Sequence, residues 1–327
     1  MIEEGALLWS PSPHFAAKSN IAGYIQWLAD RGRSFESYDA LWRWSVGDPD
    51  SFWASLWDYF EIIAEGNWSR VRSDDPMPGT RWFEGARINL TEHILRNEVR
   101  DPHAVAIHHL SEARPLQSLS WGELGDQVRR LATALRAMGI KPGDRVASCL
   151  PNIAEATVAL LATAAIGAVW TAVAPEFGPR AAIDRLSQVQ PKLLFVTDGY
   201  RYMGDDRDCR ANTTSLLHAI ETIDHVVLVP NLRPDVVAPA EPRFRLWKDI
   251  QGTEPPALGS FRYTRVASDH PLWVVFSSGT TGVPKPIVHG QLGITLELFR
   301  AQTLSMSNGV QKGPPIGVEE GPPFQII

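Results

Sequence analysis

The chain is predicted to be an α/β protein in which parallel sheets are covered by helices on both faces. Between residues 104 and 200, short β-branched runs alternate with amphipathic helical patterns, and short turns join them. Strand–helix–strand repeats of this kind build parallel sheets that need helices on each face. The 327 residues, 44% of them hydrophobic and 21% charged, suit two ordinary globular domains or one large α/β domain.

The first hundred residues form a separate, tryptophan-rich segment. Ser19 and Asn20 are expected to cap a short helix, and Pro49 occupies the first position of a second. Aromatic packing of a small helical cap explains the tryptophans, and nothing in the segment suggests catalysis. Eight of the twelve tryptophans lie here: Trp9, Trp27, Trp42, Trp44, Trp53, Trp57, Trp68 and Trp82.

The repeats that follow can be assigned in chain order. Ser120 and Glu123 form a capping box that opens an amphipathic helix, which Gly139 ends. The other predicted elements are strands over 105–107, 145–150, 169–173, 193–196 and 226–229, and helices between Asn152 and Gly167, between Gly178 and Val189, and around 216–220. Ligands bind beyond the carboxyl ends of such strands, where Glu176 is a candidate general base, although a solvated loop carboxylate is commoner.

The composition also limits the compartment and the partners. Residues 156–174 are uncharged, but Gly167 divides them, so a buried helix and a buried strand are expected rather than a membrane span. The acidic N-terminus does not resemble a signal peptide, and Cys149 and Cys209 are expected to be unpaired thiols. A net charge of −6 argues against nucleic acid as the main partner. We therefore expect a soluble, cytoplasmic protein without a membrane span.

One stretch, LWVVFSSGTTGVPKPIVHG over residues 272–290, points to chemistry. An apolar strand runs into a Gly/Ser/Thr loop with one lysine, and then a second apolar run begins. Glycines let the backbone approach a phosphate, and hydroxyls and an ammonium group supply donors. The pattern differs from the Walker A motif because prolines flank Lys285 and prevent an immediate helix. We expect a mobile flap between two strands, with an ordinary polar hairpin loop as the alternative. The apolar run at Leu272 is expected to begin a second sheet.

The loop resembles the phosphate loop of the adenylate-forming enzymes, which include the acyl-CoA synthetases. Leu41–Val46 and Trp82–Asn89 are similar to the N-terminal extension of the acetyl-CoA and acetoacetyl-CoA synthetases, and Leu7–Pro11 favours the acetoacetate enzymes. The resemblance implies ATP-dependent activation of acetoacetate and its transfer to coenzyme A, with Mg²⁺ as cofactor and Thr281 near the metal. It implies that these residues hold the ATP phosphates: Ser277, Ser278, Gly279, Thr280, Thr281, Gly282 and Lys285.

Residues 198–204 resemble the segment that meets the nucleotide end of coenzyme A, with Arg201 as the candidate contact. Asp205 and Asp206 follow where the acetoacetate enzymes usually carry a lysine, and two acids repel a polyphosphate. An exposed surface loop is the alternative. The partners implied are small molecules: acetoacetate or another short acid, ATP and coenzyme A.

The resemblance ends near residue 300. We expect an N-terminal extension over 1–100, a partial AMP-binding domain over 101–302, and an atypical, disordered Gly/Pro-rich tail over 303–327. Relatives continue with the catalytic lysine, so the chain is expected to be a truncated ligase, inactive alone. An acetyl-, propionyl- or other acyl-CoA synthetase and a non-enzymatic remnant or binding fragment are the alternatives.

Overall fold

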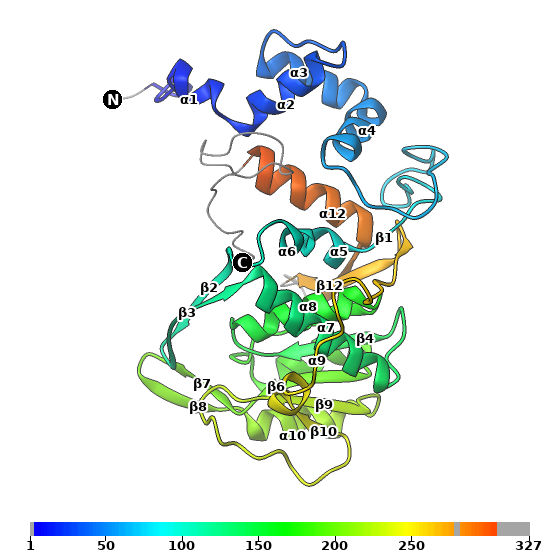
Figure 1. Ribbon diagram of the computed structural model, residues 1–327. Helices are drawn as coiled ribbons and strands as arrows, with labels where there is room; N and C mark the ends of the chain where they lie inside the picture. The colour runs from blue at the N-terminus through cyan, green and yellow to red at the C-terminus, as the bar shows by residue number, and fades with distance from the viewer. Residues whose placement is uncertain (1–2, 278–281, 306–327) are drawn as a thin grey trace. The chain divides into compact units, whose positions relative to one another are not determined.

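The computed structural model describes residues 3–277 and 282–305 (Figure 1). The described residues divide into two compact units. The first contains residues 3–62, 68–84 and 293–305, and the second contains residues 63–67, 85–277 and 282–292. The predicted domain boundaries at 100 and 302 stay predictions.

The first unit is helical. Ser19 caps α2 by accepting a bond from the backbone of Ala22, and Asp48 caps α4 in the same way from Ser51. Pro49 is the first residue of α4, as predicted. The helices are α1 (Pro13–Ala17), α2 (Asn20–Ala29), α3 (Tyr38–Gly47) and α4 (Pro49–Tyr59), with the later part of α12 (Gln291–Phe299) and the π-helix η1 (Arg300–Ser305).

Aromatic side chains pack the core of this unit, as expected, but the tryptophans lie at its margin. Tyr24, Phe60 and Phe83 are fully buried, and the Trp57 ring stacks on Phe83 at 4.7 Å between centroids. Trp9 and Trp42 are 71% and 51% exposed, so the packing prediction is wrong for these two. An indole is too large to be enclosed easily in so small a unit.

The second unit is built on one seven-stranded sheet with strand order β10-β9-β6-β4-β5-β12-β13. All neighbours are parallel except β12 and β13, which are antiparallel. The strands are β4 (Arg145–Cys149), β5 (Val169–Ala172), β6 (Leu193–Thr197), β9 (His225–Val229), β10 (Phe244–Leu246), β12 (Pro271–Ser277) and β13 (Lys285–Gly290). This arrangement confirms the predicted fold class.

Helices cover both faces of this sheet. Successive residues of β6 alternate between two apolar cores: Phe195 packs with α7 (Trp121–Ala137), α8 (Ala154–Ala165) and α11 (Trp247–Gln251), whereas Val196 packs with α9 (Pro179–Val189) and α10 (Arg210–Ala219). The capping box of Ser120 and Glu123 opens α7, as predicted. Both cysteines are free, buried thiols.

Smaller elements complete the second unit. Two hairpins stand outside the main sheet: β2 (Val105–Ser111) with β3 (Arg114–Ser120), and β7 (Gly199–Tyr202) with β8 (Asp205–Asp208). The others are the pair β1 (Arg87–Ile88) and β11 (Val266–Ala267), and helices α5 (Leu90–Ile94) and α6 (Arg96–Arg100).

Two sequence predictions were wrong here. β12 does not begin a second sheet, because it pairs in parallel with β5 and the Thr171 hydroxyl donates to the Val274 carbonyl at 2.9 Å. Asn152 does not cap α8, which begins at Ala154 after an Ile153 whose side chain makes no capping bond. β12 is also only half-buried, with Val275 41% exposed, since β12 lies next to the edge strand.

Candidate functional site

The candidate phosphate loop is the connection between β12 and β13. Ser277 ends β12 and Lys285 begins β13, and these two residues are paired in the antiparallel register. The two strands that the sequence predicts on either side of the loop are therefore present. Ser278, Gly279, Thr280 and Thr281 lie outside the described residues.

Side-chain contacts fix this hairpin at two points. The indole Nε1 of Trp273 donates to Nδ1 of His289 at 2.7 Å, which joins β12 to β13 away from the loop. The Gln188 amide of α9 donates to the Pro284 carbonyl at 3.0 Å, directly before Lys285. Gly282 has a φ of +148°, which a side chain rarely adopts, so glycine suits this position. The C-terminal side of the hairpin is thus held to α9 and to β12 by these contacts.

Lys285 is exposed at the start of β13, and Ser277 lies opposite it at the end of β12. Among residues 3–277 and 282–305, no carboxylate pairs with Lys285. An ammonium group without a counterion and a nearby hydroxyl can both bind phosphate oxygens. Among the predicted phosphate-binding residues, the structure therefore places Ser277 opposite Lys285, with Gly282 three positions before Lys285 in the chain, and their roles stay predictions.

Arg201 lies in the other hairpin, β7–β8. Its Nε donates to Asp206 Oδ1 at 2.7 Å, and the two residues are register partners. Arg207 pairs with Asp205 at 3.1 Å in the same hairpin. The acids that follow the glycine thus form a strand that neutralises the arginines. Asp206 also has a pKa below its ordinary value because the Arg201 guanidinium bonds to it.

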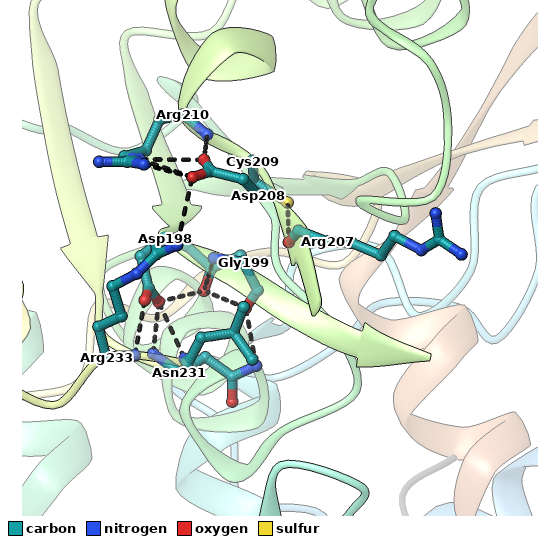
Figure 2. A network of polar contacts seen from close by, with 10 residues as sticks. Asp198, Gly199, Arg207, Asp208, Cys209, Arg210, Asn231 and Arg233 are labelled. Carbon is teal, nitrogen blue, oxygen red and sulfur yellow. Dashed lines mark hydrogen bonds and ion pairs between the residues drawn. The ribbon is translucent and has the colours of Figure 1, made fainter. Parts of the chain in front are cut away.

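Sequence reasoning missed a buried carboxylate at the base of this hairpin. Asp198 is fully buried, and its Oδ1 accepts from the backbone of Asn231 at 2.7 Å and of Leu232 at 3.2 Å, while Oδ2 accepts from Arg233 at 2.7 Å (Figure 2). A backbone N–H cluster that surrounds a carboxylate satisfies its charge. An acid directly after the buried strand β6 was the available signal.

The remaining candidates contribute no assembled site. Glu176 follows the carboxyl end of β5 and is exposed, as a solvated loop carboxylate is expected to be. Burial raises the pKa of the Cys149 thiol to about 12 and that of Cys209 to about 11, so neither is an activated nucleophile. In the part of the chain that the structure describes, no three His, Cys, Asp or Glu side chains are grouped to hold a metal.

None of the helices described in the structure combines the length and the apolar character that a membrane span requires. The uncharged residues 156–174 form most of α8 and then β5, as the sequence predicts.

Two family descriptions match the chain. "AMP-binding enzyme" matches residues 95–314, and "Acetyl-coenzyme A synthetase N-terminus" matches residues 38–94. The acetoacetyl-coenzyme A synthetase of Rhizobium meliloti is 36% identical over 291 residues, which are 89% of this chain and 44% of the relative. A malonamoyl-CoA synthetase of Penicillium aethiopicum is 33% identical over 302 residues, which are 89% of this chain and 41% of that protein.

A solved structure of the same kind of enzyme also matches the chain. The acetoacetyl-CoA synthetase from Streptomyces lividans matches with a TM-score of 0.86 and 40% identity, over 91% of this chain and 45% of that one. The chain thus spans less than half the length of these relatives. The match over residues 95–314 covers most of the chain and confirms the resemblance, and the chain therefore belongs to the AMP-binding enzyme family.

Proposed function

We propose that this chain forms the N-terminal part of an acetoacetate–CoA ligase. In this reaction, the acetoacetate carboxylate attacks the α-phosphorus of ATP and releases pyrophosphate, and the thiol of coenzyme A then displaces AMP from the acyl-adenylate. The observation that carries the proposal is the similarity to acetoacetyl-CoA synthetases, at 36% identity over 291 residues and 40% in a solved structure. The activity belongs to the whole protein, of which this chain supplies the phosphate loop.

The residues of the β12–β13 hairpin bind and orient ATP in this proposal. Lys285 places a positive charge beside the β- and γ-phosphates, and Ser277 supplies a hydroxyl donor opposite it. Adenylyl transfer depends on alignment and charge neutralisation more than on covalent help from side chains. Residues 278–282 complete the loop, and Arg201 is the proposed contact for coenzyme A.

Magnesium is assigned no step. Thr281, the predicted residue near the metal, lies outside the described residues. The described side chains offer no cluster of three metal-binding groups. Mg²⁺ commonly keeps several waters and binds through substrate phosphates, so its proposed place is on ATP rather than in a protein cage.

The test restores the missing length with a relative of known structure. Residues 1–305 are joined to the remainder of the Streptomyces lividans enzyme, and acid-dependent ATP–pyrophosphate exchange is measured. We expect exchange with acetoacetate to exceed that with acetate or propionate by about tenfold or more. Lys285→Gln should lower this exchange, whereas Lys141→Gln, the same change at another exposed lysine, should not. Equal exchange with acetate in a folded chimaera would contradict the acetoacetate assignment.

Malonamate is the second candidate acid, because a malonamoyl-CoA synthetase is 33% identical over 302 residues. Malonamate carries an amino group where acetoacetate carries a methyl group, so the two acids have nearly the same shape. A pocket that bonds to the amino group rejects the methyl analogue strongly, whereas an apolar pocket discriminates only weakly. A preference for malonamate in the same exchange assay would identify malonamate, and not acetoacetate, as the acid that the enzyme activates.

A non-enzymatic role is the remaining alternative. It predicts that the chimaera shows no exchange with any acid although circular dichroism and thermal unfolding demonstrate that it is folded. In that case, the 327-residue chain should retain a specific protein partner, and deletion of the tryptophan-rich segment should abolish the interaction.

A further inference from the structure

The turn of the β7–β8 hairpin has the shape of an anion-binding site. Tyr202 pairs with Asp205, so only Met203 and Gly204 form the turn, with φ values of +53° and +82°. Two positive φ angles in a two-residue loop are typical of a type I′ turn. The N–H groups of its central residues point out of the strand ladder, where consecutive backbone donors can hold an anion.

A carboxylate from the same unit already occupies these donors. Glu112 lies between β2 and β3, and its Oε1 accepts from Met203 N at 2.9 Å while its Oε2 accepts from Gly204 N at 2.7 Å. Figure 1 shows the ends of the two hairpins side by side. The bond from Gly204, then that from Met203, and the nearby Arg201 charge all lower the pKa of Glu112. The carboxylate is therefore ionised at neutral pH.

A second internal carboxylate occupies the arginine beside this turn. The Arg201 Nε donates to Asp206 at 2.7 Å, although both side chains are substantially exposed, at 41% and 53%. The turn and the arginine are the donors with which the hairpin would bind a phosphate, and each of them carries a counterion supplied by the chain. Two carboxylates from separate places on the chain thus occupy both backbone donors of the turn and the Nε of Arg201.

We propose that Glu112 and Asp206 are specificity-determining residues, which block the anion site of the β7–β8 hairpin until a multiply charged phosphate ligand displaces them. The ligand is the phosphorylated nucleotide end of coenzyme A, and this identification rests on the proposed ligase function. Ionised phosphates bond more strongly to guanidinium and backbone donors than a single exposed carboxylate does. Singly charged anions are excluded because they gain nothing over the internal carboxylates.

The test measures binding of adenosine 3′,5′-bisphosphate to the purified 327-residue chain by calorimetry. Glu112→Gln removes the competing charge at constant size and should tighten binding about fivefold, the effect of one nearby like charge at an exposed site. Glu221→Gln is the matched control, because it removes the same charge from an exposed residue at the amino end of β9. Adding Arg201→Ala to Glu112→Gln should return the affinity for the bisphosphate to the wild-type value or below it.

Asp206→Asn provides a second variant and should also tighten binding of the probe. The proposal is overturned if Glu112→Gln binds the bisphosphate no more tightly than Glu221→Gln, or more weakly, which would make Glu112 a support for the turn. Failure of Glu112→Gln to bind millimolar probe would overturn it as well. The probe needs neither acetoacetate nor adenylation, so these outcomes are distinct from a failure of the exchange assay that tests the ligase function.

Discussion

The two basic hairpins of the second unit differ in how their charges are satisfied. Lys285, the first residue of β13, has no carboxylate partner among the described residues. Arg201 and Arg207 of β7–β8 are paired with Asp206 and Asp205. Both hairpins present a cation, but among the described residues only the first leaves its cation without a counterion. A basic residue in a loop therefore indicates an open anion site only when its own neighbours do not neutralise it.

The backbone at the base of β7–β8 gives the largest predicted effect. A Cβ on Gly199 would lie 2.3 Å from the Arg207 carbonyl and 2.7 Å from the Leu232 side chain. Gly199→Ala should therefore separate β7 from β8 and destabilise the protein by about 4 kcal/mol. Gly259→Ala meets no atom within 4 Å and should change the unfolding free energy by less than about 0.5 kcal/mol. Urea unfolding measures both, and a neutral Gly199→Ala would show that this hairpin is not held as described.

His93 differs from the surface cations of the two hairpins, because its burial disfavours the charged form of the ring. His93 is buried, its Nε2 accepts from Ile63 N at 2.8 Å, and burial lowers its pKa from 6.5 to about 4, with Arg96 and Arg265 adding to this effect and Glu92 opposing it. Between these values, the unfolded chain binds more protons than the folded one. Stability should therefore be complete above pH 6.5 and fall by about 3 kcal/mol as the pH falls to 4.

Variants separate this contribution from the carboxylates that also titrate in acid. Chemical denaturation between pH 7 and pH 4 should show a shallower loss of stability in His93→Gln than in the wild type. His103→Gln, which changes an exposed histidine, should keep the wild-type slope. An unchanged slope in His93→Gln would contradict the neutral, buried state of the ring.

The sequence predicted regular elements well because their signals are local. The capping box of Ser120, the proline at the start of α4 and the parallel strands all follow from short patterns. Residues 205–208 read Asp-Asp-Arg-Asp and have poor strand propensity, yet they form β8 because Arg201 and Arg207 offset their charge. Such pairing depends on register, which the sequence does not specify.

The candidate site was predictable only in part for the same reason. The loop and Lys285 could be identified from residue types alone. The hydrogen bond from Gln188 to the Pro284 carbonyl joins residues that are 96 positions apart. The hydrogen bonds from the β7–β8 turn to Glu112 join residues that are 91 and 92 positions apart. Contacts between distant segments depend on the packed fold, so no short sequence pattern predicts them.

The buried carboxylate at the base of β7–β8 gives a smaller effect than Gly199→Ala. Asp198→Asn keeps the size of the side chain but replaces one accepting oxygen by an amide donor that faces a backbone N–H. We expect a loss of about 2 kcal/mol in the free energy of unfolding. Asp235→Asn is the control, because Asp235 is exposed. Equal stability of the two variants would mean that the hairpin does not depend on this carboxylate.

Pyrophosphate binding tests the difference between the hairpins most directly. Calorimetric titration of the 327-residue chain should show about tenfold weaker binding in Lys285→Gln, since a charge without a counterion is lost. Arg201→Gln should change the affinity by less than about twofold, because Asp206 competes with the anion for this arginine and leaves the β7–β8 hairpin a weaker site for pyrophosphate than Lys285. If Arg201→Gln weakened binding as much as Lys285→Gln, the β12–β13 hairpin would not be the main phosphate site of this chain.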